Sequence, residues 1–220
     1  MLSNVKYIAV LRALGAAVLV LFAGLGDAGS ARADPMAQAL PEGPQAAVRE
    51  LIDRILDSLK PDIARAERER RFERILHDGF QVPAIARFCA GTAWDGAPDV
   101  ERASYLEIFP EFLVKSYSAR FGIVYQGEKF KVVGTRSDGK DGVWVTSQLL
   151  SVDLAEEPTR VEWRMRLIDG KAWRAVDVVV EGVSMVVTQR DDFAGILRAN
   201  GDSLPRLVEM LRVKIRMMGG

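Results

Sequence analysis

Cysteine and histidine are almost absent from this chain, whose 220 residues include one of each. A lone cysteine leaves no partner for an internal disulfide, and a lone histidine excludes a histidine-rich zinc site. Cys89 stands in the apolar segment IARFCAG, which favours a buried structural thiol over a reactive nucleophile. We therefore expect a fold that is stabilised by its hydrophobic core alone.

The chain also lacks an excess of one charge sign. Lysine plus arginine and aspartate plus glutamate number 30 each, and the part after residue 33 carries 27 against 29, a net charge of −2. Proteins that bind nucleic acid neutralise phosphates with excess basic charge, so no nucleic-acid partner is expected. Even the most charged segment, residues 64–77, alternates glutamates with arginines, as a solvent-facing helix does.

Catalytic and cofactor motifs are missing as well. The sequence has no glycine-rich phosphate loop, no cluster of metal ligands and no nucleophile elbow. The segment SDGKD, residues 137–141, places carboxylates beside a glycine but lacks the length and the terminal glutamate of a calcium loop. These features predict a protein that is not an enzyme and carries no metal or cofactor.

One long apolar run is present, near the N-terminus. Residues 14–26 follow Lys6 and Arg12, and the small-residue segment ARA ends at residue 33. The run is shorter than the roughly 20 residues that span a bilayer, which favours a cleaved signal peptide, 1–33, over a retained membrane anchor. The proline-rich residues 34–44 predict a mobile lead-in, and 45–216 predict a single domain.

Two periodicities divide that domain. Apolar residues recur at helical spacing in residues 45–60, 64–77, 84–90, 98–119, 188–199 and 203–216. Alternation with a period of two marks four strands at residues 127–135, 142–152, 160–168 and 171–180. Helices followed by antiparallel strands and then helices indicate an α+β fold with helices packed around a curved sheet of about four strands.

Local signals refine three of these boundaries. Residues 94–96 are expected to form a turn, and Pro110 is expected to kink the long helix that contains it. The helix after the last strand begins at Thr188, which forms a possible capping box with Asp191, or one turn earlier at Ser184.

The most specific local signal is Asp169-Gly170, a two-residue hairpin loop between the last two strands. Counting outward from it places Met165 opposite Arg174. One face of the hairpin is then apolar and the other is charged. The predicted apolar face comprises Val161, Trp163, Met165, Leu167, Ala172, Val176, Val178 and Val180.

The same count gives two other side chains a structural interpretation. Asp177 falls on the charged face, opposite Glu162 and diagonal to Arg164, which favours a cross-strand ion pair over a catalytic base. Trp173 falls on that face opposite Arg166, which suggests a cation–π contact. Neither side chain is therefore predicted to contact a substrate.

Residues 173–197, WRAVDVVVEGVSMVVTQRDDFAGIL, resemble the signature of the MlaC family, periplasmic phospholipid-binding proteins of the Mla lipid-transport system. The matching residues are Trp173, Asp177, Glu181, Gly182, Val183, Ser184, Arg190 and Phe193. Gln189 and Val176 stand where the family has tyrosines, and Pro110 interrupts a helix that should be continuous. These departures indicate a divergent branch, similar to the hopanoid-associated HpnM group.

The resemblance implies that the sheet and helices surround an apolar cavity that takes acyl chains. The cavity wall expected on this basis comprises Phe109, Phe112, Leu113, Tyr117, Val161, Trp163, Met165, Leu167, Val176, Val178, Val180, Met185 and Phe193. Arg174, which the register count places on the apolar face near the hairpin tip, either reaches solvent at the rim or meets an anionic headgroup, and Arg190 is the second headgroup candidate.

The resemblance also implies partners and a location. The ligand would be a phospholipid or a hopanoid-type lipid, and the protein would be a periplasmic monomer that docks transiently on inner- and outer-membrane lipid-transport complexes, including an ABC transporter. Two other functions fit the same pattern. A ketosteroid-isomerase-like enzyme would need an acid or base in such a cavity, for which Tyr105 and Tyr117 remain candidates, and a structural adaptor would pack the apolar face solidly.

Overall fold

The computed structural model describes residues 43–124, 127–151 and 157–219. The expected signal peptide and almost all of the expected lead-in lie outside these residues. The helices are α2 (Pro44–Ser58), α3 (Arg65–Gly79), α4 (Val82–Ala90), α5 (Thr92–Gly96), α6 (Asp99–Val124), α7 (Met185–Ala199) and α8 (Leu204–Gly219). The strands are β1 (Lys129–Ser137), β2 (Gly142–Leu150), β3 (Thr159–Ile168), β4 (Ala172–Val180) and β5 (Val183–Ser184). Among the described helices, none has the length and apolar character that a bilayer crossing requires.

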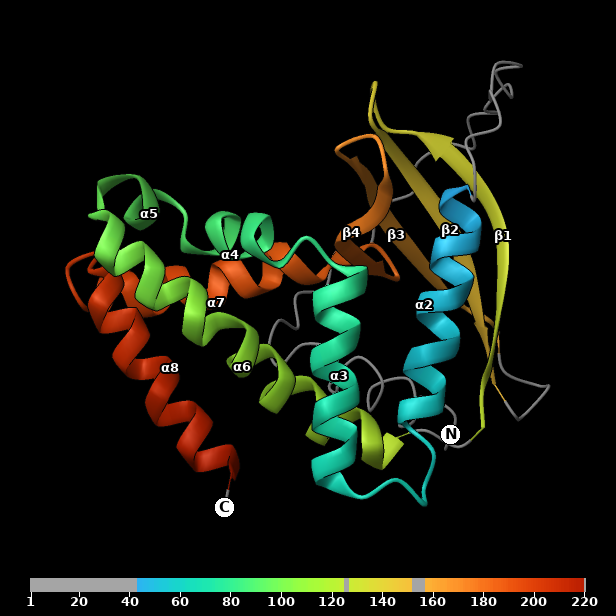
Figure 1. Ribbon diagram of the computed structural model, residues 1–220, viewed down its shortest axis with the longest axis horizontal. Coiled ribbons are helices and arrows are strands. Elements are labelled where there is room, and N and C mark those ends of the chain that lie inside the picture. Colours follow the sequence, from blue (N-terminus) through green and yellow to red (C-terminus); the bar gives the residue numbers. More distant parts are fainter. Residues whose placement is uncertain (1–42, 125–126, 152–156, 220) are drawn as a thin grey trace.

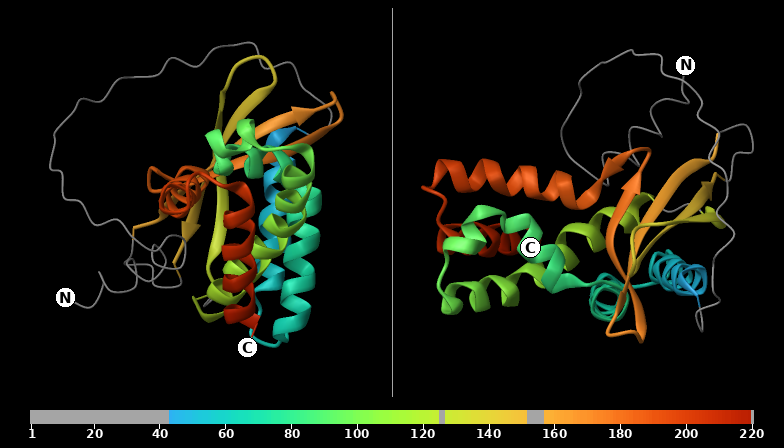
Figure 2. Two further views of the ribbon diagram at one scale, coloured as in Figure 1. Left: turned by 90° about the vertical axis from the view of Figure 1, so that its left-hand side faces the viewer. Right: turned by 90° about the horizontal axis from the view of Figure 1, so that it is seen from above.

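The five strands form one antiparallel sheet in the order β1-β2-β3-β4-β5, and the described helices lie to one side of it. Helix α2 lies along the face of the sheet, with α3 beside it (Figure 1). Helices α6 and α8 pack against each other farther from the sheet, and α7 leads from the end of β4 and β5 back to them (Figures 1 and 2). The expected α+β fold is confirmed.

The hydrophobic core is divided into two main clusters. The sheet cluster joins α2 to β2, β3 and β4 through residues such as Leu51, Val145 and Met165. The helical cluster joins α4, α6, α7 and α8, and its centre is aromatic. Phe109 and Phe193 are fully buried there, with ring centroids 6.1 Å apart in an edge-on arrangement, which is a favourable geometry for aromatic pairs.

Most helix and strand positions follow the sequence prediction, with small differences. The segment expected to be a turn at residues 94–96 belongs to the short helix α5. Helix α6 runs through Pro110 without interruption. Of the two possible starts for α7, Ser184 is the N-cap, and its Oγ accepts a hydrogen bond from the Val187 N–H at 3.1 Å.

The predicted β3–β4 register was wrong. The Asp169-Gly170 turn is present, with positive φ at both residues and a 2.9 Å hydrogen bond from the Lys171 N–H to the Ile168 carbonyl. However, Ile168 pairs with Ala172, so each residue near the hairpin tip is one position away from its predicted partner. A bulge between Met165 and Arg164 then adds a second offset, because one residue of β4 is left unpaired.

These two offsets have different consequences along β4. Near the tip, Arg174 moves from the predicted apolar face to a position opposite Arg166, and Trp173 moves to the apolar side opposite Leu167. The predicted cation–π pair of Trp173 with Arg166 is therefore wrong. Beyond the bulge, two offsets restore the original alternation, since a shift of two residues returns each side chain to the same face.

The paired residues beyond the bulge illustrate this restoration. Val178 lies opposite Trp163 and Val180 opposite Val161, all on the inner face as expected. Asp177 lies opposite Arg164, where the prediction had placed Glu162. The bulge thus determines which side chains at the end of β4 point to the inner face, where the site described next is located.

Candidate functional site

A cavity of about 240 Å³ separates the sheet cluster from the helical cluster. Its wall draws on α2, α3, α4, α6 and α7 and on β1 to β4, and nearly all of the exposed wall is apolar. The polar or charged side chains among the lining residues are Tyr117, Glu128, Thr159, Asp177 and Gln189. The volume is close to the lower end of the roughly 300–1,000 Å³ range of small-molecule pockets.

Eight of the thirteen residues predicted to form a cavity wall line this cavity. They are Phe109, Leu113, Tyr117, Val161, Trp163, Val178, Val180 and Met185. They come from α6, β3, β4 and the start of α7, and the first and last of them, Phe109 and Met185, are 76 positions apart in the chain. Tertiary packing brings the two apolar faces together around a shared space.

The other five predicted residues are not part of the wall. Phe112 and Phe193 pack against each other within the helical cluster, with ring centroids 5.7 Å apart. Met165 is 1% exposed in the sheet cluster, and Leu167 lies near the hairpin tip. Val176 is the residue that the bulge in β4 leaves unpaired. Burial in a core and exposure to the cavity give the same apolar pattern in the sequence, so that pattern cannot separate them.

The two predicted headgroup arginines also lie outside the cavity wall. The Arg174 guanidinium donates hydrogen bonds to the carbonyl oxygens of His77 and Asp78, at 2.5 and 2.7 Å, at the end of α3. Carbonyls of the last helical turn have no partner within the helix, so this arginine stabilises the α3 terminus. Arg190 stacks over the Phe88 ring at 4.8 Å.

Much of the wall that the sequence analysis missed comes from α2 and α3. The missed apolar residues are Ile55, Leu56, Leu59, Phe72, Ile75, Leu76, Phe80, Ile85, Phe130, Leu149 and Val186. The stripes on α2 and α3 were recognised as inner helix faces, but a stripe does not reveal what it faces. A wall formed by both helices could be inferred only from their position against the sheet.

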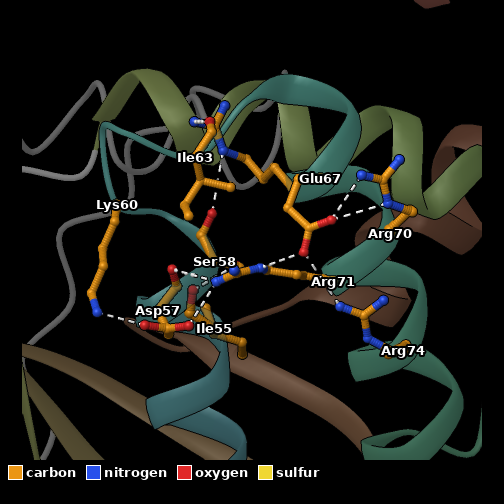
Figure 3. A network of polar contacts seen from close by, with 10 residues as sticks. Ile55, Asp57, Ser58, Lys60, Ile63, Glu67, Arg70, Arg71 and Arg74 are labelled. Atoms are coloured by element: carbon orange, nitrogen blue, oxygen red, sulfur yellow. Dashed lines mark hydrogen bonds and ion pairs between the residues drawn. The ribbon is translucent and has the colours of Figure 1, made fainter.

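Charged groups at the turn between α2 and α3 hold these two wall helices together (Figure 3). Arg71 of α3 bonds Asp57 of α2 at 2.7 Å and Glu67 at 2.9 Å, and Lys60 bonds Asp57 at 2.5 Å. Arg68 donates to the carbonyl oxygen of Ser58 at 3.3 Å, at the C-terminal end of α2. The contacts are on the solvent side of the helices, so the cavity side is left apolar.

Buried polar groups in the sheet wall are paired with one another. The Trp163 indole N–H donates to Ser147 Oγ at 3.0 Å, and Ser147 Oγ donates to the Val161 carbonyl at 3.1 Å. Because the indole N–H of Trp163 already has a hydrogen-bond partner within the sheet, Trp163 can present an apolar ring surface to the cavity.

Asp177 is a carboxyl group in the cavity wall, and it fixes the start of α7. Its two oxygens accept hydrogen bonds from Ser184 Oγ at 2.7 Å and from the Val186 N–H at 3.2 Å. Burial raises the pKa of Asp177, while these hydrogen bonds oppose the shift. The carboxyl therefore anchors the helical turn that carries Met185 and Val186 into the wall.

Of the other reactive side chains, Cys89 and Tyr105 are buried in the helical cluster, whereas Tyr117 lines the cavity. Burial raises the pKa of Cys89 to about 12, so the thiol stays protonated at neutral pH. Tyr105 is fully buried in the helical cluster and donates to the Ala86 carbonyl at 3.1 Å. Within residues 43–124, 127–151 and 157–219, no three His, Cys, Asp or Glu side chains are grouped as metal ligands.

Comparison with known proteins identifies the fold and the family. A structure of a phospholipid-binding protein from Ralstonia solanacearum in complex with a phospholipid is similar to this one, with a TM-score of 0.65 at 17% sequence identity. The similarity covers 80% of this chain and 99% of that one. The family model of the MlaC protein matches residues 45–213, which include every element from α2 to α7 and most of α8. This chain belongs to the MlaC family.

Proposed function

We propose that this protein is a periplasmic carrier that holds the acyl chains of a lipid in the cavity between its sheet and helices. The observation that carries the proposal is the apolar wall, to which residues of both core clusters contribute without filling the space between them. The similar Ralstonia protein binds a phospholipid, and this supports a phospholipid as the ligand here. The proposed export uses residues 1–33 as a cleaved signal peptide.

The energetics explain why a lipid carrier needs an apolar wall. Each methylene group withdrawn from water contributes about 0.8 kcal/mol, so ten contribute about 8 kcal/mol. A lipid already in a membrane has this stabilisation, and a protein cavity must offer a comparable environment. The wall supplies it through residues such as Phe109, Trp163 and Val178, and we expect the headgroup to stay near the polar Glu128 and Thr159.

A two-chain lipid requires more room than about 240 Å³, so we propose that the wall widens on loading. The α2–α3 pair is the best candidate for the moving part. Solvent-exposed ion pairs such as Arg71–Asp57 contribute little to stability, so they can be rearranged at small cost. Transfer between inner- and outer-membrane complexes would use the same widening for release.

A ketosteroid-isomerase-like enzyme is the second candidate, and Asp177 is the specific observation in its favour. It is a buried carboxyl with a raised pKa in an apolar cavity, which is an arrangement typical of catalytic acids and bases. Both of its oxygens already accept hydrogen bonds that anchor α7, which favours a structural role.

Lipid analysis of the purified protein tests the carrier proposal. The chain from residue 34 onward, purified without detergent, should release lipid on organic extraction and show a matching mass difference in native mass spectrometry. The same spectra distinguish a glycerophospholipid from a hopanoid-type lipid. A lipid-free protein that also takes up no fluorescent phospholipid from vesicles would contradict the proposal.

A further inference from the structure

The outer face of the sheet carries a cluster of arginines held by shared carboxylates. Glu162 of β3 bonds Arg160 at 3.0 Å and Arg136 of β1 at 3.7 Å. The Glu162 side chain is 14% exposed, whereas the two arginines are 59% and 57% exposed. One carboxylate thus lies beneath two guanidinium groups that extend towards solvent, with one positive charge in excess.

A second carboxylate repeats this arrangement nearer the hairpin tips. Asp138, in the turn after β1, bonds Arg164 at 2.6 Å and Arg166 at 2.5 Å. The hydrogen bond from Arg164, followed by that from Arg166, lowers the pKa of Asp138 to about 2, so the carboxylate stays ionised. Position 142 is glycine, and a Cβ atom there would overlap the Arg166 guanidinium and the Asp138 backbone oxygen. The backbone is therefore adapted to this cluster.

A tryptophan connects the two clusters. Trp144 of β2 pairs with Arg136 on one side and Arg164 on the other. Both guanidinium groups stack over its ring, at 4.5 and 5.5 Å from the ring centre. Stacking and shared carboxylates together fix the arginines in extended positions, which reduces the conformational entropy they would lose on binding a ligand.

These five residues form what we call the arginine face: Arg136, Trp144, Arg160, Arg164 and Arg166. It lies on the side of the sheet away from the cavity, because its members alternate along the strands with the inward-facing Val145, Trp163 and Met165. The described helices pack on the opposite side (Figure 2). The exposed Lys129 and Lys131 of β1 extend the positive charge along the same face.

We propose that the arginine face is a docking surface for the anionic phosphodiester headgroups of a phospholipid membrane. Guanidinium groups bind phosphate oxygens through paired hydrogen bonds, and several of them spread across a broad sheet match a plane of headgroups. Tryptophan is enriched at the boundary between headgroups and hydrocarbon, which fits Trp144 at the centre of the face. An acidic protein would also satisfy the charges, and the experiment below distinguishes it from a membrane.

Sedimentation with vesicles tests this proposal on the purified chain from residue 34 onward. Vesicles of equal parts phosphatidylcholine and phosphatidylglycerol should bind the protein, and vesicles of phosphatidylcholine alone should not. Each basic residue at an anionic surface is worth about fivefold in partitioning, so the double change Arg136→Gln/Arg164→Gln should weaken binding about tenfold or more. Raising the salt from about 0.01 M to about 0.15 M shortens the Debye length from about 30 Å to about 8 Å and should weaken it further.

A matched control distinguishes an effect of the arginine face from an effect of the net charge of the protein. Arg198→Gln/Arg212→Gln removes the same charge from exposed positions on α7 and α8 and should leave vesicle binding unchanged. If the first double variant does not fold, Lys129→Gln/Lys131→Gln tests the same face and should also reduce binding.

Two results would overturn the proposal. One is equal weakening by the control and the arginine-face variant. The other is wild-type protein that does not bind anionic vesicles at low salt, and binding to immobilised polyglutamate would then indicate an acidic protein partner. Because the arginine face lies away from the cavity, either result leaves the proposed carrier function standing.

Discussion

Replacing Val178 by aspartate should abolish lipid retention at neutral pH, whereas the same replacement at Val179 should not. Val178 lies opposite Trp163 and lines the cavity, while Val179 pairs with Glu162 and points to the outer face. The two valines are adjacent in one strand. The low strand propensity of aspartate therefore acts on both variants, and only Val179→Asp has the added repulsion of Glu162 opposite. Loss of lipid from Val178→Asp alone then reports on the cavity.

The size of the effect follows from the state of the new carboxyl group. In contact with acyl chains the new carboxyl group would remain protonated, because burying the carboxylate anion costs far more free energy than keeping the group neutral. An aspartate of ordinary pKa, about 3.9, must be held neutral at pH 7, about three units higher, and at 1.36 kcal/mol per unit this costs about 4 kcal/mol. Lipid retention should therefore fall roughly a thousandfold at pH 7 and by much less near pH 4.

The assay is the lipid content per protein molecule after gel filtration at pH 7 and pH 4. Wild-type and Val179→Asp proteins should retain lipid at both values. Val178→Asp should lose lipid at pH 7 and regain it when re-exposed to vesicles at pH 4. Folded Val178→Asp protein that keeps its full lipid content at pH 7 would refute the reasoning, because the acyl chains could not then contact β4.

Three further predictions concern groups around the cavity and the core. Ser184→Ala removes the N-cap of α7 and a partner of Asp177, and should lower the free energy of unfolding by about 1 kcal/mol in urea titrations. Because burial raises the pKa of Asp177, the folded state binds the proton more tightly than the unfolded state. Stability should thus fall as pH rises from about 4 through the raised pKa, and Asp177→Asn should remove this dependence. Tyr105→Phe leaves the Ala86 carbonyl without its donor and should cost about 1 kcal/mol by thermal or urea unfolding, without changing lipid content.

Sequence patterns were sufficient for elements whose signal is local. The stripe of Val48, Leu51 and Ile52 gave the position of α2 to within two residues, and period-two alternation located β1 to β4. Capping chemistry narrowed the start of α7 to two serine or threonine positions, one of which is the N-cap. The MlaC signature in residues 173–197 also identified the family correctly.

The β3–β4 register shows where local reasoning fails. The Asp169-Gly170 turn was recognised, but turn chemistry does not report how the strands pair beyond it. The one-residue offset at the turn reversed the predicted orientation of Arg174. The bulge beyond it depends on the packing of both strands against the rest of the protein, and it adds a second offset. Val178 kept its predicted face because two offsets cancelled.

Local periodicity therefore determined which residues of this chain form helices and strands and which faces are apolar, because those properties depend on neighbours in the sequence. Whether an apolar side chain meets another side chain or a cavity depends on elements far apart in the chain. Phe109 and Phe112 lie on the same helix and in the same helical cluster, yet only Phe109 also lines the cavity. Only the tertiary structure decided that difference, since it set α2 and α3 against the sheet at a distance that leaves space between the two clusters.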